Sequence, residues 1–189
     1  EITTRLVGSE MCIRDSSYSG QILVITYPLV GNYGVPQFTE ENGMLRFFES
    51  NRIHIRGLVI SDYSFKYSHW NAVESLGKWL ADNDVPAVCG VDTRQITKII
   101  RERGVMLGKV LVEGTPEPEQ FVDPNRENLV AQVSTKQAQT YGNGRHRIVL
   151  VDCGCKYNII RCLCDRDATV IRVPRDYDCL LYTSDAADD

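Results

Sequence analysis

Residues 147–163 read Arg-Ile-Val-Leu-Val-Asp-Cys-Gly-Cys-Lys-Tyr-Asn-Ile-Ile-Arg-Cys-Leu, and residues 168–174 read Ala-Thr-Val-Ile-Arg-Val-Pro. A short apolar run, a glycine turn, an amphipathic segment and a β-branched run, in this order, predict strand, turn, helix and strand. Two parallel strands joined by a helix are the opening unit of an α/β domain. Several such units are needed before both faces of the sheet are covered. We therefore expect this domain to begin here and to be truncated.

Composition indicates a globular chain without a polynucleotide partner. The 189 residues are 43% hydrophobic, and 21 Lys and Arg against 25 Asp and Glu give a formal net charge of -4. This balance leaves no basic field for nucleic acid. Apolar runs such as residues 22–27 are much shorter than the roughly 20 residues of a membrane helix, so we expect no membrane partner. Seven cysteines, an odd number, and the lack of an apolar signal segment favour reduced thiols and a cytoplasmic location.

The two ends of the chain differ in pattern from the rest. Residues 1–16 show no helical or strand periodicity, and residues 179–189 end in small and acidic side chains. Both ends contain strings that resemble translated sequencing-library sequence. We interpret 1–16 as a non-native leader and 179–189 as a non-native tail, with ordinary frayed termini as the alternative.

The remaining sequence predicts a mixture of strands and helices. Apolar and β-branched runs predict strands at residues 21–27, 56–61, 86–90 and 108–113. Helical spacing predicts helices at residues 40–50, 68–80, 93–103 and 125–134. Residues 31–34, Gly-Asn-Tyr-Gly, are a predicted turn.

Capping residues fix the expected limits of two of these helices. Ser68 is the predicted N-cap of one helix, whose buried stripe would include Ala72 and Leu76. Asp92 is the predicted N-cap of the next, which Gly104 would end. Its expected buried face consists of Ile96, Ile99 and Ile100.

The expected domain boundary lies in a segment rich in turn-forming residues. Residues 140–146 read Thr-Tyr-Gly-Asn-Gly-Arg-His, which is typical of an interdomain linker. We place the boundary near Gly144. The predicted domains are therefore an N-terminal domain over 17–144 and the start of an α/β domain over 145–178.

Two cysteine pairs invite comparison with a four-thiolate zinc site. They are Cys153 with Cys155 and Cys162 with Cys164. The pairs are spaced too closely for a zinc ribbon, and two cysteines two positions apart on a helix face away from each other. We therefore predict buried core thiols and no metal, with zinc as the minor alternative.

Other catalytic patterns have little support. The three histidines, His54, His69 and His146, show no metal-ligand spacing, and none is expected to be a general base. Cys155 lacks the flanking glycines of a nucleophile elbow. The sequence contains neither a Gly-x-x-x-x-Gly-Lys-Ser/Thr nor a Gly-x-Gly-x-x-Gly motif, so no cofactor is expected.

Several motifs occur in a fixed order over residues 17–178. They include Ser-Tyr-Ser-Gly-Gln-Ile from Ser17, Thr-Tyr-Pro-Leu-Val-Gly-Asn-Tyr-Gly from Thr26, Gly-Val-Asp-Thr-Arg-Gln-Ile-Thr-Lys from Gly90 and Val-Asp-Cys-Gly-Cys-Lys-Tyr-Asn from Val151. This set resembles the small, glutamine-hydrolysing chain of carbamoyl phosphate synthetase. The resemblance implies a mixed β/α N-terminal domain followed by a class I glutamine amidotransferase domain of α/β fold.

The resemblance also implies an activity and a partner. In that family a Cys-His-Glu triad releases ammonia from glutamine, and the ammonia passes to a large chain that makes carbamoyl phosphate for pyrimidine and arginine synthesis. The Gly-x-Cys-x-Gly and His-x-Glu motifs of the triad do not occur in these 189 residues. No catalytic residue is assigned, and we expect the fragment to be inactive alone.

One functional residue carries over from the resemblance. Ser17 corresponds to a serine that contributes to glutamine binding, although Ser16 replaces the family's preceding proline. A serine in an ordinary turn is the alternative. The motif at residues 91–94 is explained by helix capping through Asp92 and is not expected to be catalytic.

Two further expectations concern the chain as a whole. The alternative function is a noncatalytic binding or interaction module that reuses the N-terminal domain. Unpaired strands at residues 148–151 and 170–173 would expose apolar surface and favour aggregation.

Overall fold

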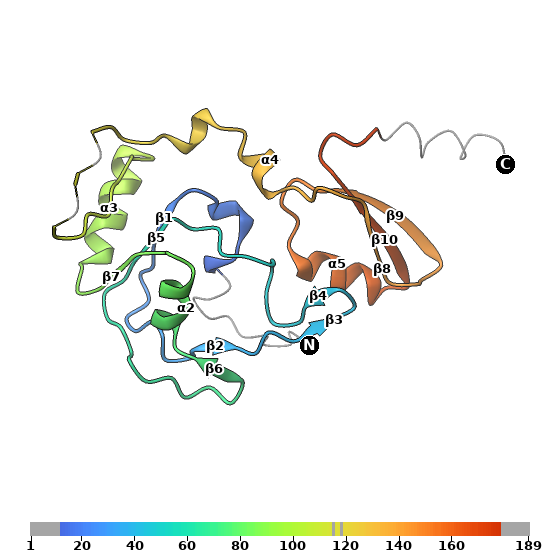
Figure 1. The fold of residues 1–189 in the computed structure, drawn as a ribbon, viewed down its shortest axis with the longest axis horizontal. Coiled ribbons are helices and arrows are strands. Elements are labelled where there is room, and N and C mark those ends of the chain that lie inside the picture. The colour runs from blue at the N-terminus through green and yellow to red at the C-terminus, as the bar shows by residue number, and fades with distance from the viewer. Residues whose placement is uncertain (1–11, 115, 118, 179–189) are drawn as a thin grey trace. The chain divides into compact units, whose positions relative to one another are not determined.

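The computed structural model describes residues 12–114, 116–117 and 119–178. The chain divides into two compact units, Glu1–Leu129 and Val130–Asp189, and no described sheet is shared between them (Figure 1). This division lies earlier in the chain than the linker expected near Gly144. The predicted tail and most of the predicted leader lie outside the described residues.

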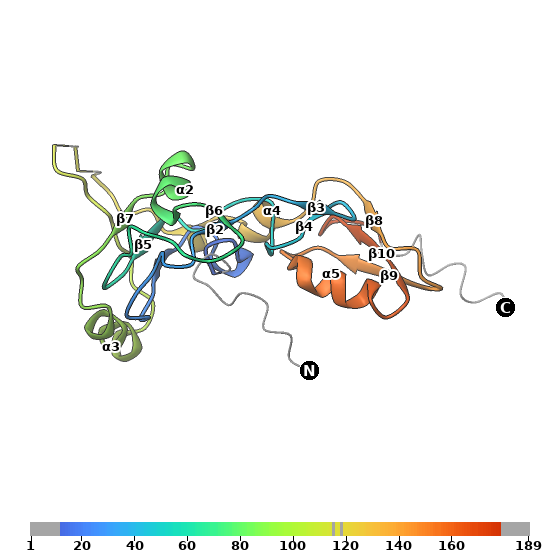
Figure 2. The ribbon, with the colours of Figure 1, turned by 90° about the horizontal axis from the view of Figure 1, so that it is seen from below.

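The first unit is built on a short parallel sheet. Its strands are β1 (Ile22–Val24), β5 (Gly57–Val59) and β7 (Ala87–Val88), in the order β1-β5-β7. The helices α2 (Leu76–Asp82) and α3 (Thr93–Arg103) lie on opposite sides of this sheet (Figure 2). The strands predicted at residues 21–27, 56–61 and 86–90 are confirmed, although each is shorter than predicted.

Two small antiparallel pairs of strands also lie in the described part of this unit. They are β2 (Val35–Pro36) with β6 (Ala72–Glu74), and β3 (Glu40–Glu41) with β4 (Met44–Leu45). The prediction of a helix at residues 40–50 was wrong, because the second pair of strands occupies this segment. Asn42 has φ 52° and Gly43 has φ 74°, so two successive residues adopt the left-handed conformation of a tight hairpin turn.

The helix predicted at residues 68–80 begins later than expected. Ser75, not Ser68, is the N-cap of α2, and its hydroxyl accepts a hydrogen bond from the Lys78 N–H at 3.2 Å. Ala72 belongs to β6, because pairing with β2 draws residues 72–74 into a strand. Leu76, Trp79 and Leu80 form the buried face of the shortened helix.

Helix α3 has the predicted ends but not the predicted burial. The Asp92 carboxylate accepts a hydrogen bond from the Gln95 N–H at 2.9 Å, and Gly104 ends the helix with φ 81°. Thr93 is its only buried residue, and Ile100 is 38% exposed. Strands of two or three residues provide too little surface to cover the isoleucine face.

The end of this unit is largely irregular. Residues 108–113 are described and form no strand, so the strand predicted there was also wrong. The helix predicted at residues 125–134 divides into a 3₁₀ turn, η2 (Pro124–Arg126), and the helix α4 (Leu129–Val133), most of which belongs to the second unit.

A buried cluster lies beneath α2. Phe48, Leu58 and Leu76 are almost completely buried within it. The Arg14 guanidinium lies 4.1 Å from the centre of the Phe48 ring and 5.2 Å from that of Trp79. A cation stacked on aromatic rings contributes to the packing of its segment.

The second unit contains the strand-helix-strand arrangement predicted from residues 147–174. The strands β9 (His146–Val151) and β10 (Ala168–Val173) are parallel and are joined by α5 (Tyr157–Cys164). The strand β8 (Gln139–Tyr141) pairs antiparallel with β10 and gives the order β8-β10-β9. The expectation that residues 148–151 and 170–173 are unpaired was wrong, because β9 pairs with β10 and β10 is the central strand.

Candidate functional site

Ser17, the residue expected to contact glutamine, lies in an exposed turn of the first unit. It belongs to the short 3₁₀ helix η1 (Ser16–Tyr18). Its N–H donates to Asp15 Oδ1 at 3.0 Å, and its carbonyl accepts from Gln21 Nε2 at 3.2 Å. The backbone of Ser17 is therefore held by side chains on both sides. The glutamine contact stays a prediction.

The backbone of His54 forms hydrogen bonds with residues before and after the same turn. Its backbone N–H donates to the Ile13 carbonyl at 3.1 Å, and its backbone carbonyl accepts from the Gly20 N–H at 3.1 Å. The side chain is buried, and no hydrogen-bond partner of Nδ1 lies among the described residues. Burial, assisted by the nearby Arg52, lowers the pKa of His54 from 6.5 to about 4, so the imidazole is uncharged at neutral pH.

The other two histidines make local contacts. His69 Nδ1 accepts from the Asn71 N–H at 3.2 Å, and His146 Nε2 accepts from Arg145 Nε at 3.1 Å. Within the described ranges, no group of three or more His, Cys, Asp or Glu side chains is arranged to hold a metal ion.

Asp152 organises the turn between β9 and α5 in the second unit. It is completely buried at the carboxyl end of β9. Its Oδ1 accepts from the Gly154 N–H at 2.9 Å and the Cys155 N–H at 2.8 Å. Its Oδ2 accepts from Arg172 Nη2 at 2.6 Å and from the Thr135 N–H. One carboxylate therefore connects the turn, the central strand and the segment before β8.

This arrangement gives Asp152 a positioning role. The carboxyl ends of parallel strands are where open α/β sheets bind ligands. Both oxygens of Asp152 already accept hydrogen bonds from the protein, so the carboxylate is not placed to act as a general base. Sequence reasoning predicted a glycine turn in this segment and assigned no role to Asp152. Arg172 is a charged residue at the fifth position of the mostly apolar strand β10, and it was the sequence signal for a buried acidic partner.

The cysteines are less buried than predicted. Cys153 is exposed, whereas Cys155, Cys162 and Cys164 are half-buried. Cys155 Sγ lies 3.5 Å from the Lys156 carbonyl. Burial raises the pKa of the Cys164 thiol, which makes it a weak nucleophile. The prediction of buried core thiols was therefore wrong for Cys153 and only partly right for the others.

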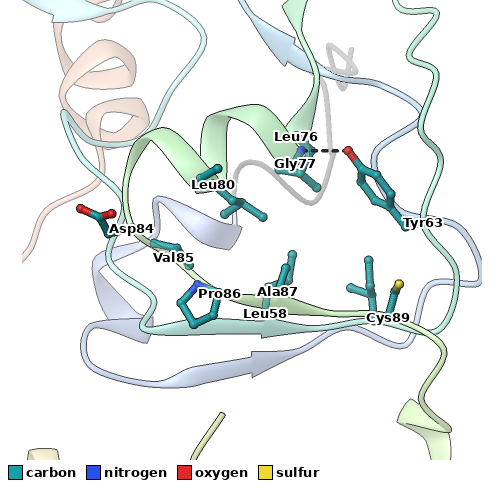
Figure 3. Close-up of a pocket in the computed structure, with 12 residues that line it drawn as sticks. Leu58, Tyr63, Leu76, Gly77, Leu80, Asp84, Val85, Pro86, Ala87 and Cys89 are labelled. Atoms are coloured by element: carbon teal, nitrogen blue, oxygen red, sulfur yellow. Dashed lines mark hydrogen bonds between the residues drawn. The ribbon is translucent and has the colours of Figure 1, made fainter. Parts of the chain in front are cut away.

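A pocket of about 560 Å³ lies between α2 and the strands β5 and β7 (Figure 3). Its walls are mostly apolar and include Leu58, Leu76, Leu80 and Ala87. The Tyr63 hydroxyl accepts from the Gly77 N–H at 2.9 Å at one end of the pocket. Sequence reasoning missed this pocket, because it depends on how α2 is placed over strands that are distant in sequence.

Comparison with known proteins identifies a family that matches part of this chain. The family described as "Carbamoyl-phosphate synthase small chain, CPSase domain" matches residues 2–110. The chain is 47% identical over 182 residues to the carbamoyl phosphate synthase arginine-specific small chain of Saccharomyces cerevisiae, a match that covers 93% of this chain and 44% of that one.

Longer relatives contain the same segment. The chain is 49% identical over 178 residues to carbamoyl-phosphate synthase [ammonia], mitochondrial, of Homo sapiens, covering 93% of this chain and 12% of that protein. It is 48% identical over 177 residues to the multifunctional protein CAD of Squalus acanthias, covering 92% and 8%. The chain spans less than half the length of these curated relatives.

Proposed function

The chain belongs to the carbamoyl-phosphate synthase small-chain family, and we propose that it is part of a chain that hydrolyses glutamine and passes the ammonia to a large chain. The large chain would use that ammonia to make carbamoyl phosphate for pyrimidine or arginine synthesis. The observation that carries this proposal is the 47% identity to a fungal small chain over nearly the whole of these residues.

Each unit has a part in this proposal. The first unit presents Ser17 on a turn whose backbone is held by Asp15 and Gln21, and the serine would contact glutamine. The second unit would open the amidotransferase domain, with Asp152 shaping its first strand-to-helix turn. A cytoplasmic location stays a prediction, since some relatives are named as mitochondrial. In the part of the chain that the structure describes, no helix is long and apolar enough to cross a membrane.

The proposal is tested with the open reading frame that contains this segment, expressed together with its large chain. Carbamoyl phosphate formation is measured with glutamine and, separately, with ammonium. The Ser17→Ala variant is expected to raise the KM for glutamine and to leave the ammonium-supported rate unchanged. Equal loss with both nitrogen sources would assign Ser17 a role in folding or assembly instead.

The 189 residues alone are expected to release no ammonia from glutamine. They contain neither the Gly-x-Cys-x-Gly motif nor the His-x-Glu motif that the family uses for this reaction. An assay with isotopically labelled glutamine measures the release directly. Turnover that depends on Cys153 or Cys155 would contradict this expectation.

A second candidate function is a noncatalytic module that associates with the rest of a synthase. The match to a synthase whose name specifies ammonia favours this candidate. If the complete chain supports carbamoyl phosphate formation with ammonium but not with glutamine, the noncatalytic module is the better description.

A further inference from the structure

One edge of the parallel sheet in the first unit is uncovered. The carbonyls of Pro86 and Val88 accept hydrogen bonds at 3.0 and 2.9 Å from the N–H groups of Leu58 in β5 and of Ile60, which directly follows β5. Because backbone groups alternate sides along a strand, the N–H and C=O groups of Ala87 and Cys89 face away from β5. Among the described residues no strand pairs with that side of β7, and residues 86–90 are all exposed.

This edge also lacks the usual protection. Natural edge strands carry charged side chains, bulges or prolines that discourage further pairing. Here Pro86 precedes the strand, but Ala87, Val88 and Cys89 are uncharged, and Val88 is 36% exposed. The outward N–H and C=O groups are therefore open to pairing with another extended chain.

The pocket beneath α2 lies along this open edge (Figure 3). Ala87 and Cys89 line the pocket and Val88 does not, which is the alternation of a β-strand. A strand added to β7 would also direct every second side chain toward α2. The apolar walls from Leu76 and Leu80 favour an aliphatic side chain there.

The two ends of the pocket differ in charge. Asp84 lies at one end, and among the described residues its carboxylate has no ion-pair partner. Tyr63 and Cys89 lie at the other end (Figure 3). A basic residue of an added strand would be favoured where it meets Asp84.

We propose that the groove between α2 and β7 binds an extended segment of another protein chain. The segment adds as a strand to β7, places an aliphatic side chain in the pocket and carries Lys or Arg where it meets Asp84. This mode takes affinity from main-chain hydrogen bonds and specificity from pockets for alternate side chains. The proposal requires neither glutamine nor synthase activity, so it stands apart from the proposed function.

Synthetic peptides test this binding mode on the full 189-residue chain. The probes are eight-residue peptides of alternating valine and threonine with one lysine at either the first or the last position, and matched peptides with glutamate instead. One lysine peptide is expected to shift the amide resonances of Ala87 and Cys89 and to slow their hydrogen exchange. It should bind at least 5-fold more tightly than its glutamate counterpart, and the Asp84→Asn variant should remove this preference.

Variants separate the backbone contact from the pocket contact. Ala87→Pro removes an N–H that faces away from β5 and is expected to abolish binding. Ala81→Trp, at an exposed pocket-lining position of α2, is expected to weaken binding at least 10-fold. Val88→Thr is the matched control, because Val88 does not line the pocket, and it should bind as the parent does. Circular dichroism verifies that each variant is folded.

Two results would overturn the proposal. The first is no resonance shift at Ala87 or Cys89 with any of the four peptides at millimolar concentration, because main-chain pairing tolerates most side chains. The second is protein-concentration dependence of the same resonances without peptide, accompanied by dimer formation in sedimentation. That result would assign the edge to a second copy of this chain.

Discussion

At the scale of single residues, the buried His54 next to the turn that carries Ser17 makes the stability of the fold depend on pH. Its folded pKa of about 4 lies below the 6.5 of an unfolded histidine. Between these values the unfolded chain binds a proton that the folded chain does not, so stability rises with pH in this range. The contribution is fully present above pH 6.5 and is lost as the pH falls toward 4.

We therefore expect urea unfolding of the chain to show a lower free energy of unfolding at pH 4.5 than at pH 7. The loss from His54 is at most about 3 kcal/mol, since one pKa unit corresponds to about 1.4 kcal/mol. The His54→Phe variant, which cannot titrate, should show a smaller dependence, and His146→Gln, at an exposed site, should behave as the parent does. A His54→Phe variant with the parent's full pH dependence would contradict this account.

At the scale of elements, the N-cap of α3 gives the motif at residues 91–94 a structural explanation. The Asp92 carboxylate satisfies the Gln95 N–H, one of the amides left free at the start of a helix. Asp92→Ala is expected to cost about 1 kcal/mol of stability, whereas Asp92→Asn should cost much less because the amide oxygen also caps. Chemical denaturation measures both. Equal losses for the two variants would show that the negative charge, and not the cap, is what matters.

The elements also show what the sequence could predict. The unit formed by β9, α5 and β10 was predictable because apolar runs, a glycine turn and a helical stripe agree within one short stretch. Capping residues likewise fixed the ends of α3. The hairpin at residues 40–45 was missed because the prediction followed the helical spacing over residues 40–50 and did not use the Asn42-Gly43 turn signal. Local pattern also misplaced the start of α2, because pairing between β2 and β6 decides that residue 72 is extended.

The features of the candidate sites also divide into those that local sequence predicts and those that depend on contacts between distant segments. Ser17 was named through a resemblance carried by consecutive residues, and its backbone contacts are local. The Asp152 network, the groove beside β7 and the burial of His54 each depend on segments distant in sequence. Local periodicity does not predict contacts between distant segments, so these features could be identified only from the structure.

At the scale of the whole molecule, we expect the outer edge of β9 in the second unit to contribute to association between copies of the chain. Strand β9 has no pairing partner on its outer edge within the described residues, and Val151 is 40% exposed. Apolar strand edges of this kind template association between chains, and a lysine on the edge discourages it. Val151→Lys is therefore expected to raise the concentration at which light scattering detects aggregates, with a stability change within about 0.5 kcal/mol.

The matched substitution on the central strand separates edge pairing from a general effect of charge. Val170→Lys would place a cation at a completely buried position of β10, which pairs on both sides. It should unfold the second unit, because an unpaired buried charge costs several kcal/mol, and unfolding should increase aggregation. If both lysine variants reduce aggregation equally, net charge controls solubility. If only Val151→Lys does so, the edge of β9 is the surface through which the chains associate.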